Sequence, residues 1–240
     1  MKLTAYSERG IVNTLFYEIF HSKNADNLLE DLLAIARFPA REKTSLPFKN
    51  AKIFVEQSFS HFGDADVLIL LNSSVKKVSI FVEAKAKKSW RIQTQFQKFI
   101  EGTKSKVSSS NLFTQFYHKI RLVDAIKTVG IPGLQEGIIF PPSSSRSLRK
   151  IGSNEVVLNS VKELSMYLDE TYYLAILPNN PSEVETFYNN ELREMKPINF
   201  PGWDTINFGY ITWKQIHDFC EEHNLVSSLY VFEHNRGQIY

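Results

Sequence analysis

The sequence predicts an α/β protein in which a central mixed β-sheet is flanked by helices. Near-continuous apolar runs at 65–71 and 77–85 are typical of strands that are covered on both faces. Apolar residues recur at helical spacing over 6–20 and 24–37, before these strands, and over 111–129 after them. Consecutive strands followed by a helix and a further strand indicate a meander that feeds a crossover, and this arrangement gives a mixed sheet.

The first half of the chain supplies clear boundaries for these elements. Ser7 is a candidate cap for the first helix, and Pro39 closes the second. Residues 51–58, AKIFVEQS, are rich in strand-forming side chains and predict a further strand. The polar residues 72–74, NSS, form a turn of hairpin length between the two apolar runs.

The second half of the chain predicts alternating helices and short strands. We expect a helix over 91–101, and we expect Gly130, Pro132 and Gly133 to break the helical pattern that precedes them. The remaining expected elements are strands at 136–140 and 171–177, a helix at 159–168, a helix near 212–223 and a strand near 228–232.

Length and composition favour one globular domain over residues 1–240. We expect its core over about 6–177 and a turn-rich, aromatic C-terminal extension over about 178–240. No run approaches the roughly 18 apolar residues that cross a bilayer, and the first ten residues lack the apolar stretch of a secretory signal. A single cysteine, Cys220, excludes an intrachain disulfide and fits a reducing compartment. We therefore expect a cytoplasmic protein without a membrane partner.

The net charge of +2 does not by itself indicate a nucleic-acid partner, but basic residues cluster in two places. Residues 85–106 carry seven Lys and Arg side chains against the lone acid Glu101, and Arg146, Arg149 and Lys150 follow a loop of Pro and Ser. Such clusters supply the phosphate contacts that dominate nucleic-acid affinity. Taken alone, however, a basic run is better explained by a solvated helix face.

Two acids and a lysine are expected to meet at one end of the sheet. Glu83 and Lys85 are two positions apart on a strand and should project from the same face. A hairpin about residues 72–77 would bring Asp66, at the start of one strand, beside Glu83, at the end of the next. Carboxylate oxygens suit Mg²⁺ or Mn²⁺, and a lysine can stabilise developing charge and orient or deprotonate an attacking water.

These residues carry a resemblance to a known family. FGDADVLIL followed by VSIFVEAK resembles the bipartite motif of the PD-(D/E)xK nuclease superfamily, which includes many restriction endonucleases, resolvases and repair exonucleases. Asp66 matches the first acid, with Ala65 where a proline usually stands, Glu83 matches the second acid and Lys85 the lysine. Glu8 resembles the helical glutamate that many members use to complete the metal's shell. The expected order of elements also resembles the family's core, and the resemblance covers about residues 6–140.

The resemblance implies a restriction-endonuclease-like core and a nuclease that depends on Mg²⁺ or Mn²⁺, with DNA as the expected substrate. Asp66 and Glu83 would hold the metal, Glu8 would complete its shell, and Lys85 would assist the attacking water. A homodimer would fit the cleavage of both strands of a duplex. The side chains expected to contact nucleic acid are Lys87, Lys88, Arg91, Gln95, Arg146 and Arg149.

Alternatives stay open for individual residues and for the function. Asp64 competes with Asp66 as the first acid but also fits a turn, and Glu8 equally suits the positive end of a helix. Glu56 fits an additional ligand less well than an exposed strand carboxylate, and Gln95 also suits a solvated helix face. The chain could instead retain a nuclease-like fold as a nucleic-acid-binding or assembly module. A third alternative is a chance E-x-K on an unrelated α/β protein.

Overall fold

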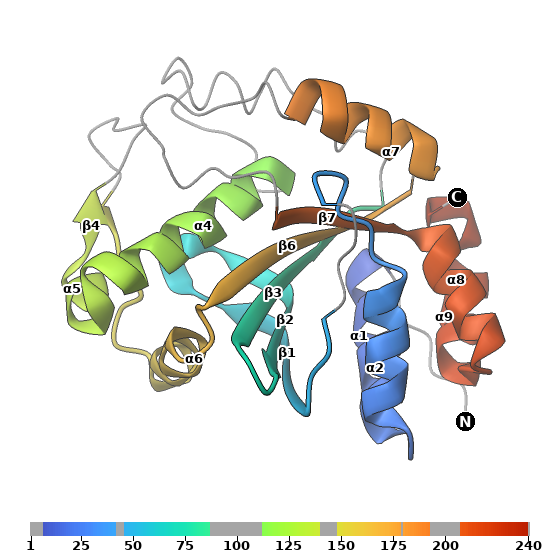
Figure 1. Ribbon diagram of the computed structural model, residues 1–240, viewed down its shortest axis with the longest axis horizontal. Coiled ribbons are helices and arrows are strands. Elements are labelled where there is room, and N and C mark those ends of the chain that lie inside the picture. The colour runs from blue at the N-terminus through green and yellow to red at the C-terminus, as the bar shows by residue number, and fades with distance from the viewer. Residues whose placement is uncertain are drawn as a thin grey trace.

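A computed structural model describes residues 7–41, 46–86, 112–139, 148–178, 180–192 and 207–239. Within these ranges the chain forms a five-stranded mixed sheet with helices on both faces (Figure 1), which confirms the predicted class. The strand order is β1-β2-β3-β6-β7, antiparallel from β1 to β3 and parallel from β3 to β7. The strands of this sheet are β1 (Asn50–Ser58), β2 (Asp64–Asn72), β3 (Lys77–Ala84), β6 (Glu170–Leu177) and β7 (Phe208–Thr212).

The hairpin of β2 and β3 has the register that the sequence predicts. Its ladder runs from Asn72 opposite Lys77 to Val67 opposite Val82. The hydroxyl of Ser73 accepts hydrogen bonds from the backbone N–H groups of Val75 and Lys76 and closes the turn. The predicted antiparallel hairpin is therefore confirmed, and β3 lies between β2 and the parallel strand β6.

Alternate side chains of the strands enter two separate hydrophobic cores, one on each face of the sheet. Leu68 and Leu70 of β2 belong to the first core, whereas Val67 and Ile69 belong to the second. Strands of near-continuous apolar character are thus covered on both faces, as predicted. The helices that pack on the first core are α4 (Leu112–Thr128), α5 (Gly130–Glu136), α6 (Glu155–Ser165) and α7 (Pro181–Phe187). Those on the second core are α1 (Ser7–His21), α2 (Ala25–Ala34), α8 (Trp213–Glu222) and α9 (Val226–Ile239).

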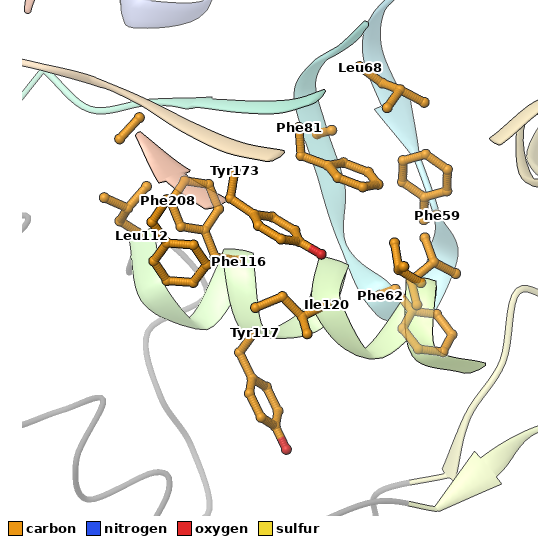
Figure 2. Packing of buried hydrophobic residues seen from close by; sticks show 14 of the residues in the cluster. Phe59, Phe62, Leu68, Phe81, Leu112, Phe116, Tyr117, Ile120, Tyr173 and Phe208 are labelled. Carbon is orange, nitrogen blue, oxygen red and sulfur yellow. The ribbon is translucent and has the colours of Figure 1, made fainter. Parts of the chain in front are cut away.

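Aromatic rings dominate the first core (Figure 2). Phe81 of β3 stacks on Tyr173 of β6 with ring centroids 5.9 Å apart. Phe59 precedes the 3₁₀ turn η1 (Ser60–Phe62), which leads into β2, and Phe62 is its last residue; both rings are fully buried in this core with Ile120 of α4. The turn before β2 is therefore anchored to α4 by packing.

At the end of the chain the helix predicted near 212–223 is confirmed as α8, but the strand predicted near 228–232 is wrong. Residues 228–232 form part of helix α9, whereas strand β7 was missed. Helix α9 is fixed by α1, because the Glu18 carboxylate accepts hydrogen bonds from the N–H groups of Ser227 and Ser228 at the start of α9. Local strand propensity in this segment is overridden by that tertiary cap. Residues beyond 178 contribute β7 to the central sheet, where it pairs with β6.

Two further predictions need correction in the middle of the chain. The helical pattern of α4 does end before Gly130, but Gly130, with φ +68°, begins a new helix, α5, and both Pro132 and Gly133 lie inside it. Proline is compatible with the first turn of a helix, because its missing N–H would have no partner there. The strand expected at 136–140 is only β4 (Ile138–Ile139), which pairs with β5 (Leu148–Arg149) outside the central sheet. The expected helix at 91–101 lies outside the described residues.

The outer edge of β7 is covered at one point by the segment that follows α2. The N–H of Arg37 donates to the carbonyl of Tyr210, and the N–H of Tyr210 donates back to the carbonyl of Arg37. Within the described ranges, no helix combines the length and the apolar character that a membrane crossing requires.

Substituting Gly209→Ala should destabilise the fold by about 1–3 kcal/mol. A Cβ at this position of β7 would lie 2.5 Å from the ring of Phe38, which is itself packed edge-on against Tyr172. Urea unfolding measures the change, and Gly237→Ala is the matched control, because a Cβ there meets nothing within 4 Å. Equal stability of the Gly209 variant and the wild type would contradict the close packing of Phe38 on Gly209.

Candidate active site

Asp66 and Glu83 lie at the same end of the hairpin, one position beyond the last backbone pair, Val67 with Val82. Asp66 Oδ2 accepts a hydrogen bond of 2.8 Å from the backbone N–H of Ala84. The carboxylate of Asp66 thus accepts the N–H that a backbone carbonyl would accept if the pairing of β2 and β3 continued. The two acids, 17 positions apart in the sequence, come from neighbouring strand ends.

Glu83 is completely buried, and neither of its carboxylate oxygens accepts a hydrogen bond from the described residues. Burial raises the pKa of Glu83 to about 8; the charge of Lys119 opposes this shift, the charge of Asp66 adds to it, and Lys85 and Arg9 oppose it. A buried carboxylate without donors is costly for a protein to keep. Its two open oxygens fit a site for a cation with oxygen ligands.

Lys119 of α4 is the cation nearest to this carboxylate among the described ion pairs, with Nζ 3.9 Å from Glu83 Oε1. It is as completely buried as Glu83, and its ammonium donates hydrogen bonds to the carbonyls of Phe62, at 3.0 Å, and Asp64, at 2.9 Å. Burial lowers the pKa of Lys119, and the charge of Glu83 opposes this shift. The sequence analysis missed this residue.

A signal for Lys119 was nevertheless present in the sequence. It lies at helical spacing between Phe116 and Val123, within the stripe of α4 that packs on the sheet. A charged side chain at a core position needs a buried partner. The sequence could therefore have predicted an ion pair between Lys119, the one lysine in this apolar stripe, and Glu83 of β3.

Arg9 and Lys85 are two further cations whose charges act on Glu83, and both are less buried than Lys119. Arg9 Nε of α1 lies 3.7 Å from Asp66 Oδ1, and its side chain is 54% exposed. Lys85 is half-buried, and its main chain is fixed on two sides. Its N–H donates to the carbonyl of Ile176, and its carbonyl accepts from Trp213 Nε1 at 3.0 Å. The position of Lys85 after Glu83 is thus held by β6 and α8.

Glu8 contacts the segment that follows β3 but is not a member of a carboxylate cluster. Its Oε2 accepts a hydrogen bond of 2.6 Å from the backbone N–H of Ala86. Asp66 and Glu8 therefore satisfy the N–H groups of Ala84 and Ala86 in turn, as a neighbouring strand would. This contact is a structural explanation for Glu8, beside the ligand role that the resemblance implies.

Within the described residues, one group of three potential ligand side chains has its ligand atoms within 4.8 Å of one another, and it is not the expected one. It consists of His217, Asp218 and Glu221 on α8, of which the two acids are exposed. Lys214 Nζ already lies 2.8 Å from both oxygens of Asp218. Glu8, Asp66 and Glu83 do not form such a three-carboxylate group.

The other two acids weighed for the site, Glu56 and Asp64, make different contacts. Glu56 of β1 accepts a hydrogen bond of 2.5 Å from Asn13 Nδ2 on α1. Asp64 is exposed and contributes its backbone carbonyl, which accepts from Lys119. Of the two aspartates, Asp66 is thus the one whose carboxylate lies at the end of the hairpin beside Glu83.

The expected nucleic-acid contacts are only partly described. Arg149, on β5, is half-buried and donates to the backbone carbonyl of His61 in the turn before β2. The carbonyl of the next residue, Phe62, accepts a hydrogen bond from Lys119, which lies beside Glu83. The turn at His61 and Phe62 thus connects Arg149 to the two acids. The positions that lie outside the described residues are Lys87, Lys88, Arg91, Gln95 and Arg146.

Comparisons with protein-family models, curated proteins and solved structures found no match to the chain.

Replacing Glu8→Ala should lower the free energy of unfolding by about 1–2 kcal/mol, because the N–H of Ala86 loses its charged acceptor. Amide hydrogen exchange at Ala86 should accelerate in the variant, and urea unfolding gives the energy. Glu30→Ala on the exposed face of α2 is the control and should change neither quantity. Unaltered exchange at Ala86 would contradict this structural role of Glu8.

The protein should lose stability in acid in part through His118 of α4. Burial, together with the charges of Arg149 and Lys119, lowers the pKa of His118 from 6.5 to about 3. The unfolded state thus binds the proton more tightly. As the pH falls from 6.5 toward 3, this group should remove up to about 1.4 kcal/mol of stability per pH unit. Urea unfolding of wild type and His118→Gln at pH 7 and pH 5.5 checks the sign: the variant should lose less.

Proposed function

We propose that the chain is a divalent-metal-dependent nuclease that hydrolyses phosphodiester bonds of DNA. The observation that carries the proposal is the meeting of Asp66 and Glu83 at the end of the β2–β3 hairpin. There the Glu83 carboxylate is buried yet accepts no hydrogen bond from the described residues. Lys85 follows two positions later, and its charge acts on Glu83. A carboxylate pair beside a lysine is the donor set that phosphodiester hydrolysis with Mg²⁺ or Mn²⁺ uses.

Each of the described residues would have a separate role in the reaction. Asp66 and Glu83 would hold the Mg²⁺ or Mn²⁺, which when bound polarises a phosphoryl oxygen and lowers the pKa of a water. Lys85 would orient or deprotonate the attacking water and stabilise charge on the phosphate. Glu8 would keep the segment after β3 in place through Ala86, so that Lys85 stays beside Glu83.

A restriction-endonuclease-like core is part of this proposal. The antiparallel meander of β1, β2 and β3, followed by a crossover to the parallel strand β6, supports it. Arg149 would contact the phosphate backbone, because it is joined through the turn at His61 to the carbonyls that Lys119 binds. The homodimer and the cytoplasmic location rest on the sequence argument alone.

Purified protein should cleave plasmid, linear or single-stranded DNA in the presence of Mg²⁺ or Mn²⁺ and not with chelator. Asp66→Asn, which keeps an oxygen for the Ala84 N–H, and Lys85→Ala should each reduce the rate on the order of 100-fold or more. Asp26→Asn and Lys127→Ala, both exposed, are the matched controls and should retain full activity. Cleavage that survives either site substitution would refute the assignment.

The complete burial of Glu83 favours one rival, a nuclease-like fold that binds nucleic acid or a partner without cutting. Thermal unfolding with and without Mn²⁺ separates the two functions. The enzyme should be stabilised by Mn²⁺, and Glu83→Gln should abolish that stabilisation. A binding module should show no stabilisation that depends on Glu83.

A further inference from the structure

Lys119 is a fully buried ammonium that lies between three parts of the molecule. It projects from α4, its Nζ binds the carbonyls of Phe62 and Asp64 in the segment entering β2, and it lies 3.9 Å from Glu83 Oε1 on β3. The ring of Phe59 is 5.8 Å from the same nitrogen. One cation thus connects the start of the strand that carries Asp66 with the end of the strand that carries Glu83.

We propose that Lys119 is a positioning residue of the nuclease centre. Its ammonium fixes the start of β2 relative to the end of β3 and so keeps the carboxylates of Asp66 and Glu83 at the separation that one divalent cation requires. This inference rests on the proposed function and adds to it a residue from outside the sequence motif.

Backbone pairing alone does not fix the two acids. The ladder of β2 and β3 ends at Val67 with Val82, so residues 66 and 83 lie just past it. Beyond that point Asp66 binds the N–H of Ala84, and Lys119 binds the carbonyl of Asp64, two residues before Asp66. Because metal ligands must be held within a few tenths of an ångström, these side-chain contacts determine whether the site is preorganised.

The energetics of the pair also favour a functional role. A buried ion pair is often no more stabilising than apolar residues of similar volume, and Lys119 lies in a core of phenylalanines that would accept such a residue. At 3.9 Å, moreover, the ammonium balances the charge of Glu83 without donating a hydrogen bond to it. The Glu83 oxygens therefore keep lone pairs that a bound cation can use. A shorter salt bridge, with a hydrogen bond from Lys119, would occupy them.

Lys119 acts through its neighbours, because it is completely buried and has no surface to offer a substrate. Its two carbonyl contacts hold the turn at Phe62, and its charge offsets that of Glu83. Lys85, which is half-buried and follows Glu83, keeps the role at the attacking water. The two lysines therefore have separate tasks at the same pair of acids.

The test compares Lys119→Met with Lys127→Met, an exposed lysine on the same helix, in the full-length chain. Mn²⁺ affinity is measured by calorimetry well below the unfolding temperature, and cleavage of plasmid DNA gives kcat and KM. Lys119→Met should bind Mn²⁺ about 10–100-fold more weakly and lose kcat by a similar factor. KM for DNA should stay within roughly two-fold, because the lost contacts are not substrate contacts. The Lys127 variant should match the wild type.

The outcomes separate this inference from the nuclease proposal. A Lys119→Met protein that melts earlier but binds Mn²⁺ as tightly as the wild type would overturn the positioning role and leave the nuclease proposal standing. A wild type that neither binds Mn²⁺ nor cuts DNA would overturn both. If Lys119→Met does not yield folded protein, Lys119→Gln takes its place under the same criteria, because its neutral amide can donate to the two carbonyls and so favour folding but lacks the charge that holds Glu83.

Discussion

The antiparallel pairing of β2 with β3 is the constraint on which the rest of the molecule depends. It places β3 next to the parallel strand β6, and it brings the start of one strand beside the end of the other. A shift of one residue in this register would turn every side chain of β3 to the opposite face. Glu83 would then leave α4 and Lys119, and the apolar residues of β3 would exchange cores.

Polar groups gather at this sheet end because the backbone ladder stops there. Asp66 and Glu8 accept the N–H groups of Ala84 and Ala86, while Lys85 continues the pairing with β6. Two carboxylates thus fix the direction in which the chain leaves the sheet after β3. Glu83, at the same end of the sheet, differs from these two acids, because its oxygens accept no hydrogen bond from the described residues.

The sequence predicted the parts of the fold whose signal is local. The apolar runs of β2 and β3 with the turn at 72–74, and the helical spacing of α1, α2 and α4, specified those elements closely. It failed where tertiary contacts decide, at α9, which Glu18 caps from α1, and at β7, a short strand held by β6 and Arg37.

The candidate site divides in the same way. Asp66 and Glu83 could be brought together from the hairpin alone, because strand pairing is a local rule. Arg9 could not be placed, since α1 meets the sheet through packing that no short pattern encodes. Lys119 had only one sequence signal, its place in the apolar stripe of α4, and the structure was needed to show its contact with Glu83. The role of Glu8 also needed the structure, because its acceptor contact is with a backbone N–H 78 positions away.

The hydrogen bond from the indole of Trp213 to the carbonyl of Lys85 gives the site an optical reporter. The indole is 1% exposed and lies edge-on to Phe232, so its emission depends on a dry, fixed environment. Any displacement of Lys85 would change the polarity around the ring and shift that emission. Fluorescence, read in a chain whose other two tryptophans are replaced, could therefore follow the lysine in real time without a label.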